Sequence, residues 1–235
     1  MQDLLYEGKA KKIYREGEGL VRQRFKDIAT AFNGEKKATV VGKAALNARF
    51  CALFFELLEK EALPTHFVSF DPPDSLITLE LKMIPLEVVV RNRVAGSLSK
   101  RFPAEDKKSL EPPVVEYFLK NDAQNDPKVE EDLLVSLFHY DKKELLELRS
   151  FALKVNEILG FFVQTKGVDL IDLKLEFGRS PDGSILLGDE ISPDTCRFWD
   201  VETGESLDKD RFRFEKGDLI EGYQKLATRL GLGGS

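Results

Sequence analysis

The sequence is poor in the residues that build metal scaffolds and disulfide frameworks. Only two cysteines and two histidines occur among its 235 residues, and Cys51 and Cys196 lie far apart without a CxxC partner. Structural zinc sites need several Cys or His ligands at short spacings, and disulfide scaffolds need more cysteines in a shorter chain. Neither is expected here. We expect His66 and His139 to be structural, because neither has a second His or a carboxylate at a useful spacing.

Long apolar runs and an excess of positive charge are also missing. No stretch approaches the roughly 20 consecutive apolar residues that span a bilayer, and the first residues form neither a basic nor an apolar leader region. The chain has 35 Lys and Arg against 41 Asp and Glu, a formal net charge of −6. We therefore expect a cytoplasmic protein with no membrane partner and no nucleic-acid partner. Local lysine clusters can still bind one small polyanion.

What the sequence does contain is typical of a folded α+β chain. It is 42% hydrophobic and 32% charged, which argues against disorder and supports an extensive core. Apolar residues at helical spacing predict helices over residues 44–62, 142–166 and 219–230. Short apolar or β-branched runs predict strands over residues 4–6, 13–14, 20–25, 65–70, 76–81 and 86–90, with two more after the second helix. Strands and helices mix without strict βαβ alternation, so we expect an α+β fold.

Prolines interrupt this pattern at two places. Pro85 lies between two predicted strands and is the best candidate for a domain boundary or hinge. Residues 101–113 contain three prolines among charged side chains, and we expect an irregular exposed connection there.

A predicted hairpin brings carboxylates together in the segment 168–191. Alternation along its first strand places Asp172, Lys174 and Glu176 on one face and apolar residues on the other. If Asp182 and the glycine after it are the two central residues of the turn, Glu176 lies directly opposite Asp189. Opposed carboxylates repel unless a cation lies between them. Mg²⁺ takes oxygen ligands and often uses one or two carboxylates plus substrate phosphates, so this pair is a candidate metal site.

The plain alternative is a solvated outer face of a hairpin, which needs no function. The register is also open, because a longer loop would shift it. The segment 188–200 favours a functional reading, since it places four acids and an arginine directly after a strand, with a proline turn among them.

Three further clusters suit phosphate groups. The segment GKAKK over residues 8–12 lacks the Walker A spacing, but its glycine turn and lysines can cover a triphosphate. In the segment 88–98 an apolar strand runs into Arg91 and Ser97, which suit a phosphate monoester. The segment 120–127 is polar and turn-forming. Each segment also has a plain alternative. For 8–12 it is an edge strand whose lysines prevent pairing with another chain, for 88–98 an arginine that caps a strand end, and for 120–127 an ordinary loop.

Together these segments resemble the bacterial phosphoribosylaminoimidazole-succinocarboxamide synthase family, also called SAICAR synthetases. The resemblance runs in order over nearly the whole chain, and its last two motifs are specific. It rests on five motifs: LYEGKAKKIY at 5–14, VVVRNRVAGS at 88–97, KND with NDP within 120–127, DLKLEFG at 172–178 and LGDEISPD at 187–194.

The resemblance implies a two-lobed α+β fold, with a smaller antiparallel β lobe over residues 1–83, a larger lobe over 84–235 and ATP in the cleft between them. It implies catalytic roles for Lys11, Lys174 and Asp172, and Mg²⁺ ligation by Glu176 and Asp189. The residues it implies for ATP binding are Gly8, Lys9, Ala10, Lys11, Lys82, Met83 and Lys120. Those it implies for the carboxyaminoimidazole ribotide, CAIR, are Arg91, Ser97, Asp194 and Arg197.

The implied activity is an ATP-dependent ligation of purine biosynthesis. CAIR and L-aspartate are the implied substrates, ATP and Mg²⁺ the implied cofactors, and an acyl phosphate the implied intermediate. Members of the family are often homodimers, so a homodimer is an open expectation. A small-molecule kinase with a related cleft is the alternative enzyme, and a nucleotide-binding module is the alternative without catalysis. Two segments depart from the family pattern: TAFNG at 30–34 and Asn125 in place of a histidine.

Overall fold

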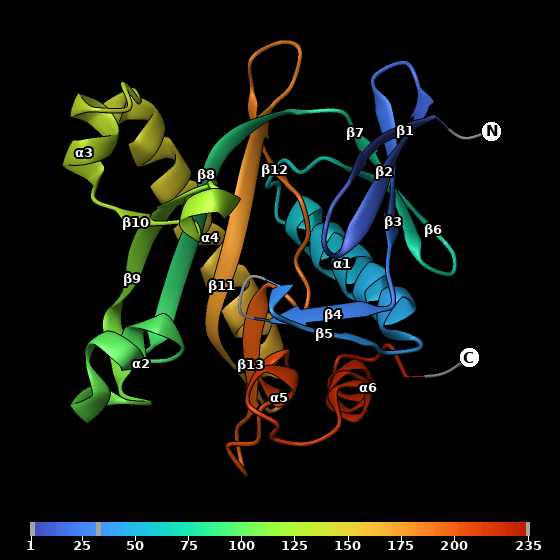
Figure 1. Cartoon of the computed structure of the whole chain (residues 1–235), viewed down its shortest axis with the longest axis vertical. Helices are drawn as coiled ribbons and strands as arrows, with labels where there is room; N and C mark the ends of the chain where they lie inside the picture. The colour runs from blue at the N-terminus through green and yellow to red at the C-terminus, as the bar shows by residue number, and fades with distance from the viewer. Residues whose placement is uncertain (1–2, 32–33, 234–235) are drawn as a thin grey trace.

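The computed structural model describes residues 3–31 and 34–233, and its elements form two antiparallel sheets with helices between and beside them (Figure 1). The first sheet has the strand order β1-β2-β3-β7-β6. Its strands are β1 (Leu4–Glu7), β2 (Lys11–Gly17), β3 (Leu20–Phe25), β6 (Phe67–Asp71) and β7 (Ser75–Leu79). Strands β4 (Ile28–Ala31) and β5 (Lys36–Thr39) pair with each other in a separate ribbon.

The second sheet carries half of the polar residues predicted to be functional. Its order is β10-β9-β8-β11-β12, and β13 also pairs with β11. Its strands are β8 (Lys82–Arg93), β9 (Ser109–Leu119), β10 (Lys128–Val129), β11 (Val168–Arg179), β12 (Ile185–Gly188) and β13 (Cys196–Asp200). On β11, Leu173, Leu175 and Phe177 are buried on one face, and Phe177 packs on Phe151 of a helix. Asp172, Lys174 and Glu176 therefore share the opposite face, as the alternation predicts.

Three helices confirm the periodicity of the sequence: α1 (Lys43–Lys60), α4 (Lys142–Gln164) and α6 (Leu219–Arg229). Helices α4 and α6 begin at aspartates, Asp141 and Asp218, whose carboxylates accept hydrogen bonds from backbone N–H groups of the first turn. Helix α1 ends before Pro64, which cannot continue it. The short helices are α2 (Ser97–Arg101), α3 (Glu131–Ser136) and α5 (Asp210–Arg213), with 3₁₀ turns η2 (Pro103–Glu105) and η3 (Asp122–Gln124).

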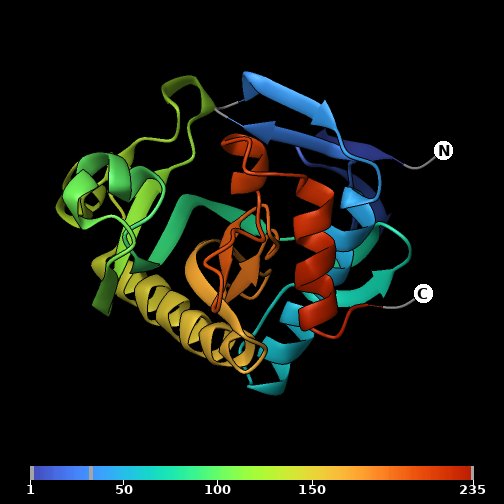
Figure 2. The same cartoon turned by 90° about the horizontal axis from the view of Figure 1, so that it is seen from below.

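Helices α1 and α4 join the sheets through one continuous cluster of buried hydrophobic residues. Helix α4 lies along one face of β8 and β11, and α1 lies beside α6 (Figure 2). On α1, Phe54 stacks on Phe198 of β13 and Phe50 packs edge-on against Tyr223 of α6. The division of the chain after residue 83 stays a prediction, since both parts contribute to this core. Over the described residues, no helix is both long and apolar enough to cross a membrane.

The predicted hairpin forms, but its predicted register is wrong by one residue. Glu176 pairs with Gly188, not with Asp189. The backbone N–H of Ser180 bonds the carbonyl of Ser184, and Gly183 adopts a positive φ of 90°. The loop therefore holds three residues with glycine in the left-handed position, a common hairpin geometry that shifts the register relative to a two-residue turn.

Two other predictions about connections are also corrected. Pro85 does not end a strand, because β8 runs continuously from Lys82 to Arg93. It lies where the pairing of β8 with β11 is irregular, and a strand tolerates proline at such a place because no ladder hydrogen bond is lost. The segment 101–113 is only partly irregular, since β9 begins at Ser109 and pairs with Arg93.

Candidate active site

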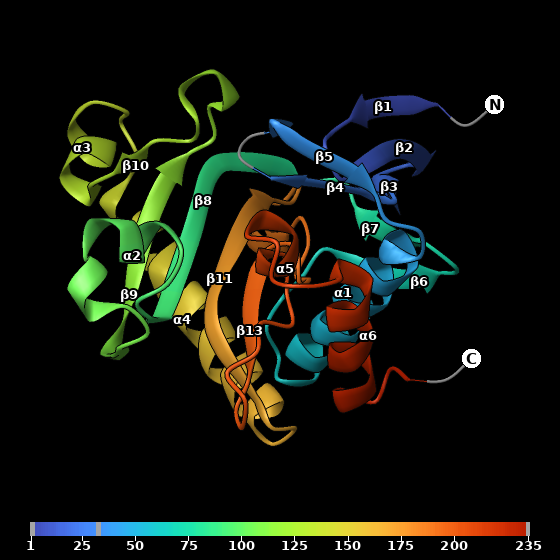
Figure 3. The same cartoon turned by 60° about the horizontal axis from the view of Figure 1, so that its bottom comes forward.

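A cavity of about 690 Å³ lies between the second sheet, the loop after β12, α5 and the β4–β5 ribbon. Strand β4 and helix α5 lie side by side at its edge (Figure 3). Eight of the residues predicted from the sequence line it: Lys9, Ala10, Arg91, Ser97, Asp172, Lys174, Asp194 and Arg197. Segments that are distant in the sequence thus supply one common wall.

At one end of the cavity, two arginines share an aspartate. Arg91 Nη1 and Arg197 Nη1 lie 3.1 Å and 2.8 Å from Asp172 Oδ2. Arg91 Nη2 donates to Ser97 Oγ at 2.8 Å, and Arg197 Nε donates to Asp210 Oδ2 at 2.8 Å. Burial alone would lower the pKa of Arg197, but Asp172 and Asp210 raise it above its usual value. The Arg197 guanidinium therefore keeps its charge, and the hydrogen bonds hold both guanidinium groups in a fixed orientation.

The loop between β8 and α2 is shaped to admit Arg197. Gly96 has φ 57° and ψ −124°, a conformation that is essentially restricted to glycine. A Cβ atom on Gly96 would lie 2.5 Å from Nη2 of Arg197. Gly96 therefore allows the conformation of the turn and also leaves room for the Arg197 guanidinium.

A second group joins lysines to the two carboxylates predicted to bind metal. Lys11 Nζ lies 2.5 Å from Asp189 Oδ1, and Lys120 pairs with Glu176. Lys174 pairs with Glu176 and lies 3.9 Å from Asp189 Oδ2. Burial would raise the pKa of Asp189, yet Lys11 and Lys174 hold it well below its usual range. Lys174 thus joins the two acids although they are not cross-strand partners.

The acids suit Mg²⁺ only together with ligands from a substrate. Within residues 3–31 and 34–233, no cluster of three or more His, Cys, Asp or Glu side chains is arranged to hold a metal ion. Glu176 and Asp189 offer two carboxylates, which is the number that Mg²⁺ often takes when phosphates complete its shell. Lys174, close to both, shows that a positive charge is favourable there.

A third group lies on the loop after β12 and was largely missed by sequence reasoning. Asp194 accepts from Lys43 Nζ at 2.5 Å and from Tyr223 Oη at 2.5 Å, and Lys209 Nζ lies 3.9 Å from it. Lys43 and Tyr223 come from α1 and α6, where the periodicity gives no sign of a polar contact. Glu190 also lines the cavity, and burial raises the pKa of its carboxyl. In the sequence, Glu190 could have been recognised from its position in the acidic segment after β12.

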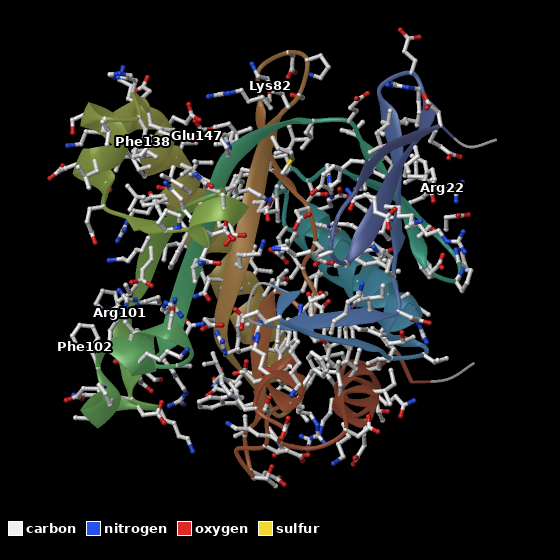
Figure 4. All side chains as sticks on the ribbon, in the orientation of Figure 1. Arg22, Lys82, Arg101, Phe102, Phe138 and Glu147 are labelled. Atoms are coloured by element: carbon white, nitrogen blue, oxygen red, sulfur yellow. The ribbon has the colours of Figure 1, made fainter. Side chains whose placement is uncertain are left out.

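Three further predicted residues, Gly8, Lys82 and Met83, are not among those that line this cavity. Gly8 forms the turn before β2, with its N–H bonded to the carbonyl of Lys11. Lys82 and Met83 line a different hollow of about 410 Å³, next to Phe138, and Lys82 and Phe138 lie in the same part of the molecule (Figure 4). A Cβ atom on Gly188 would lie 3.2 Å from Met83, so Met83 lies beside the start of the Asp189 loop.

The two departing segments also reach the cavity. Thr30, Ala31 and Gly34 line it on one side and Asn125 on another. Phe32 and Asn33, which complete the first segment, lie outside the described residues.

The sequence model of the SAICAR synthetase family matches residues 4–230. The chain belongs to this family. A phosphoribosylaminoimidazole-succinocarboxamide synthase of Thermococcus sibiricus is 50% identical over 96% of this chain and 97% of that protein. One from Persephonella marina is 48% identical over 97% of this chain and 96% of that protein.

Solved structures of SAICAR synthetases share the fold. A type-2 structure in complex with ADP matches with a TM-score of 0.91 and 48% identity, covering 98% of both chains. The structure from Ehrlichia chaffeensis matches with a TM-score of 0.95 and 38% identity, covering 99% of this chain and all of that one. The α+β fold predicted from the sequence is therefore confirmed.

Family membership also decides the activity. The chain is an ATP-dependent carbon–nitrogen ligase of purine biosynthesis, which joins the CAIR carboxylate to the amine of L-aspartate and gives SAICAR, ADP and phosphate. The alternatives of a small-molecule kinase and a non-catalytic nucleotide-binding module do not match the names of these relatives.

Proposed function

We propose that the 690 Å³ cavity is where the chain activates CAIR with ATP and then joins it to L-aspartate. The observation that carries this proposal is the convergence of two cationic groups on one cavity. Arg91 and Arg197 lie at one end, and Lys174 links the Glu176 and Asp189 carboxylates beside it. Two phosphorylated substrates need two such groups.

The reaction proceeds in two displacements. An oxygen of the CAIR carboxylate attacks the γ-phosphorus of ATP, and the bond from that phosphorus to the β–γ bridging oxygen breaks, releasing ADP. The amine nitrogen of aspartate then attacks the acyl carbon, the bond from carbon to the phosphate oxygen breaks, and the nitrogen loses its proton. Lys11, Lys120 and Lys174 neutralise charge on the transferring phosphoryl group, so catalysis is mainly positioning and electrostatics.

We assign the CAIR phosphate to the end formed by Arg91, Ser97 and Arg197. Asp172 accepts from both guanidinium groups and holds them in place, while their other N–H groups suit phosphate oxygens. Fixing the ribotide at its phosphate holds the carboxylate at the far end in line with ATP. Asp194, held by Lys43 and Tyr223, lines the same cavity.

We assign the ATP phosphates to the turn formed by Gly8, Lys9, Ala10 and Lys11, and the adenine to the region of Lys82 and Met83, between lobes formed by residues 1–83 and 84–235. Glu176 and Asp189 would hold Mg²⁺, which supplies charge neutralisation on the phosphates when it is bound. We further propose that the chain works in the cytoplasm on small-molecule substrates, without nucleic acid or membrane. We also propose that it forms a homodimer.

Replacing Arg197 tests the assignment of the phosphate end. We expect Arg197→Met to lower kcat/KM for CAIR by about a hundredfold or more, because a buried charge-assisted contact to phosphate is lost, while KM for ATP changes little. Arg93→Met is the matched control, since Arg93 lies on β8 but pairs with Asp169 at the surface. Steady-state assays of SAICAR formation check both. An unchanged kcat/KM for CAIR in Arg197→Met would contradict the assignment.

A further inference from the structure

Glu190 is a buried carboxylate that lines the cavity without a full set of partners. Its side chain is 6% exposed, and it belongs to the cavity wall. Among the residues that the structure describes, no hydrogen-bond donor reaches its Oε2 atom. A buried acceptor without a donor costs free energy, more so for a charged group. A ligand in the cavity can supply the missing donor.

Two lysines that influence Glu190 pair with its neighbours in the loop. Lys11 lies 2.5 Å from Asp189 and Lys43 lies 2.5 Å from Asp194, on either side of Glu190 in the loop. Both lysines influence Glu190 through space, but neither forms a hydrogen bond with it among the described contacts. Lys174 and Lys209 likewise lie 3.9 Å from Asp189 and Asp194. Among the described residues, the close ion pairs of this loop therefore go to Asp189 and Asp194, and the carboxylate of Glu190 has none.

The substrates limit what can match this charge. ATP and CAIR are anionic, and both carboxylates of aspartate are anionic as well. The ammonium group of aspartate is therefore the one cationic group that the three substrates bring. Mg²⁺ is the other cation of the reaction, and the acids proposed to bind it, Glu176 and Asp189, are the ones that Lys174 joins.

Hydrogen bonds fix the backbone of the loop that carries Glu190. Thr195 Oγ1 lies 3.3 Å from the carbonyl oxygen of Glu190 and accepts from the N–H of Ser192. The N–H of Lys174 on β11 donates to the carbonyl of Thr195 at 2.9 Å, which ties the loop to the sheet. Glu190 is thus fixed on the loop between Asp189, assigned to the metal, and Asp194, assigned to CAIR.

We infer that Glu190 binds the amino group of L-aspartate and holds its nitrogen next to the activated CAIR carboxylate. This inference rests on the proposed function, because it names the residue that receives the second substrate in the same cavity.

Succinate provides the test, since it has both carboxylates of aspartate but lacks the amine. We expect Glu190→Gln to raise KM for L-aspartate at least about tenfold, because a hydrogen bond between charged groups is lost. The inhibition constant of succinate against aspartate is expected to stay unchanged or fall, because Glu190 makes no favourable contact with succinate. KM for ATP and for CAIR should change by less than about twofold.

One control variant and one alternative substitution of Glu190 complete the test. Glu147→Gln is the matched control, because Glu147 lies exposed on α4 (Figure 4) and does not line the cavity. Glu190→Asp withdraws the carboxylate by one methylene while keeping its charge, so it serves if Glu190→Gln fails to fold. It should also weaken aspartate and not succinate.

Three results would overturn the inference. Equal weakening of aspartate and succinate would assign Glu190 a structural role only. A raised KM for CAIR with an unchanged KM for aspartate would assign it to the neutral amine of CAIR, and a raised Mg²⁺ requirement alone would assign it to the metal. Wild-type protein that forms no amide from ATP, CAIR and aspartate would instead contradict the proposed function.

Discussion

At the scale of single residues, the position of Arg197 depends on Gly96 having no side chain. Gly96 lacks the Cβ atom that would lie 2.5 Å from the Arg197 guanidinium, and its positive φ suits glycine alone. The sequence placed Gly96 with Arg91 and Ser97 in a segment that suits a phosphate, and the family resemblance added Arg197, but neither gave Gly96 a role toward Arg197. The close approach of Arg197 comes from β13, which is distant in the sequence.

Gly96→Ala should therefore damage both binding and stability. We expect KM for CAIR to rise at least about tenfold, because the new methyl group displaces Arg197. We expect the free energy of unfolding to fall by about 2 kcal/mol from backbone strain. Steady-state kinetics and urea denaturation measure the two effects.

Gly204→Ala is the control, because Gly204 also has a positive φ of 68° but no atom within 4 Å of a new Cβ. It should lose stability through strain alone and keep its KM for CAIR. Equal kinetic effects in both variants would show that the guanidinium is not displaced.

At the scale of elements, helix α4 covers the second sheet and holds it by a polar contact as well as by apolar packing. Tyr117 of β9 is 4% exposed and donates from Oη to the carbonyl of Leu145 on α4 at 2.9 Å. Burial raises the pKa of Tyr117 to about 12. The sequence predicted α4 and its buried stripe, but this cross-element contact depends on how the helix is placed on the sheet.

The raised pKa of Tyr117 predicts a loss of stability at alkaline pH. Unfolded tyrosine ionises above about pH 10, whereas folded Tyr117 keeps its proton up to about pH 12. The unfolded state therefore binds fewer protons in this window, so stability falls as pH rises, by at most about 1.4 kcal/mol per pH unit for this group. Tyr117→Phe should remove that contribution and cost about 1 kcal/mol at pH 7 through the lost hydrogen bond.

Urea denaturation at pH 7, 10 and 11.5 checks the prediction. Tyr6→Phe is the control, because Tyr6 is 62% exposed and lies on β1 opposite Ile13 of β2. The stabilities of wild type and Tyr6→Phe should fall in parallel with pH. A Tyr117→Phe variant that falls as steeply as wild type would refute the assigned shift.

At the scale of the whole molecule, the site exists only where the two sheets meet. Lys11 comes from the first sheet, Glu176 and Lys174 from the second, and Asp189 from the loop that follows β12. Each of the two carboxylates therefore already pairs with a lysine before any substrate binds. A nucleotide with Mg²⁺ that binds this junction should stabilise the complete fold.

Asp189→Asn should remove the increase in stability that Mg²⁺ and nucleotide give to the wild type. In wild type, Mg²⁺ and ADP at about a hundredfold excess over Kd should add about 2.7 kcal/mol, or roughly 5–10 °C in Tm. In Asp189→Asn we expect this Mg²⁺-dependent increase, and SAICAR formation, to be abolished in a folded protein. Differential scanning calorimetry with and without Mg²⁺ measures it. A normal increase with near-normal activity would remove Asp189 from the proposed metal site.

The sequence alone determined the elements and the face on which the charges lie, because alternation along β11 and helical periodicity are local properties. It also determined the family, through motifs that are continuous in the chain. Only the tertiary structure decided the hairpin register, since a three-residue loop and a two-residue turn both accommodate Asp182 and Gly183. It alone brought Lys43 and Tyr223 onto Asp194 and left Glu190 with an unpartnered oxygen, because those contacts depend on α1 and α6 packing together across long stretches of chain.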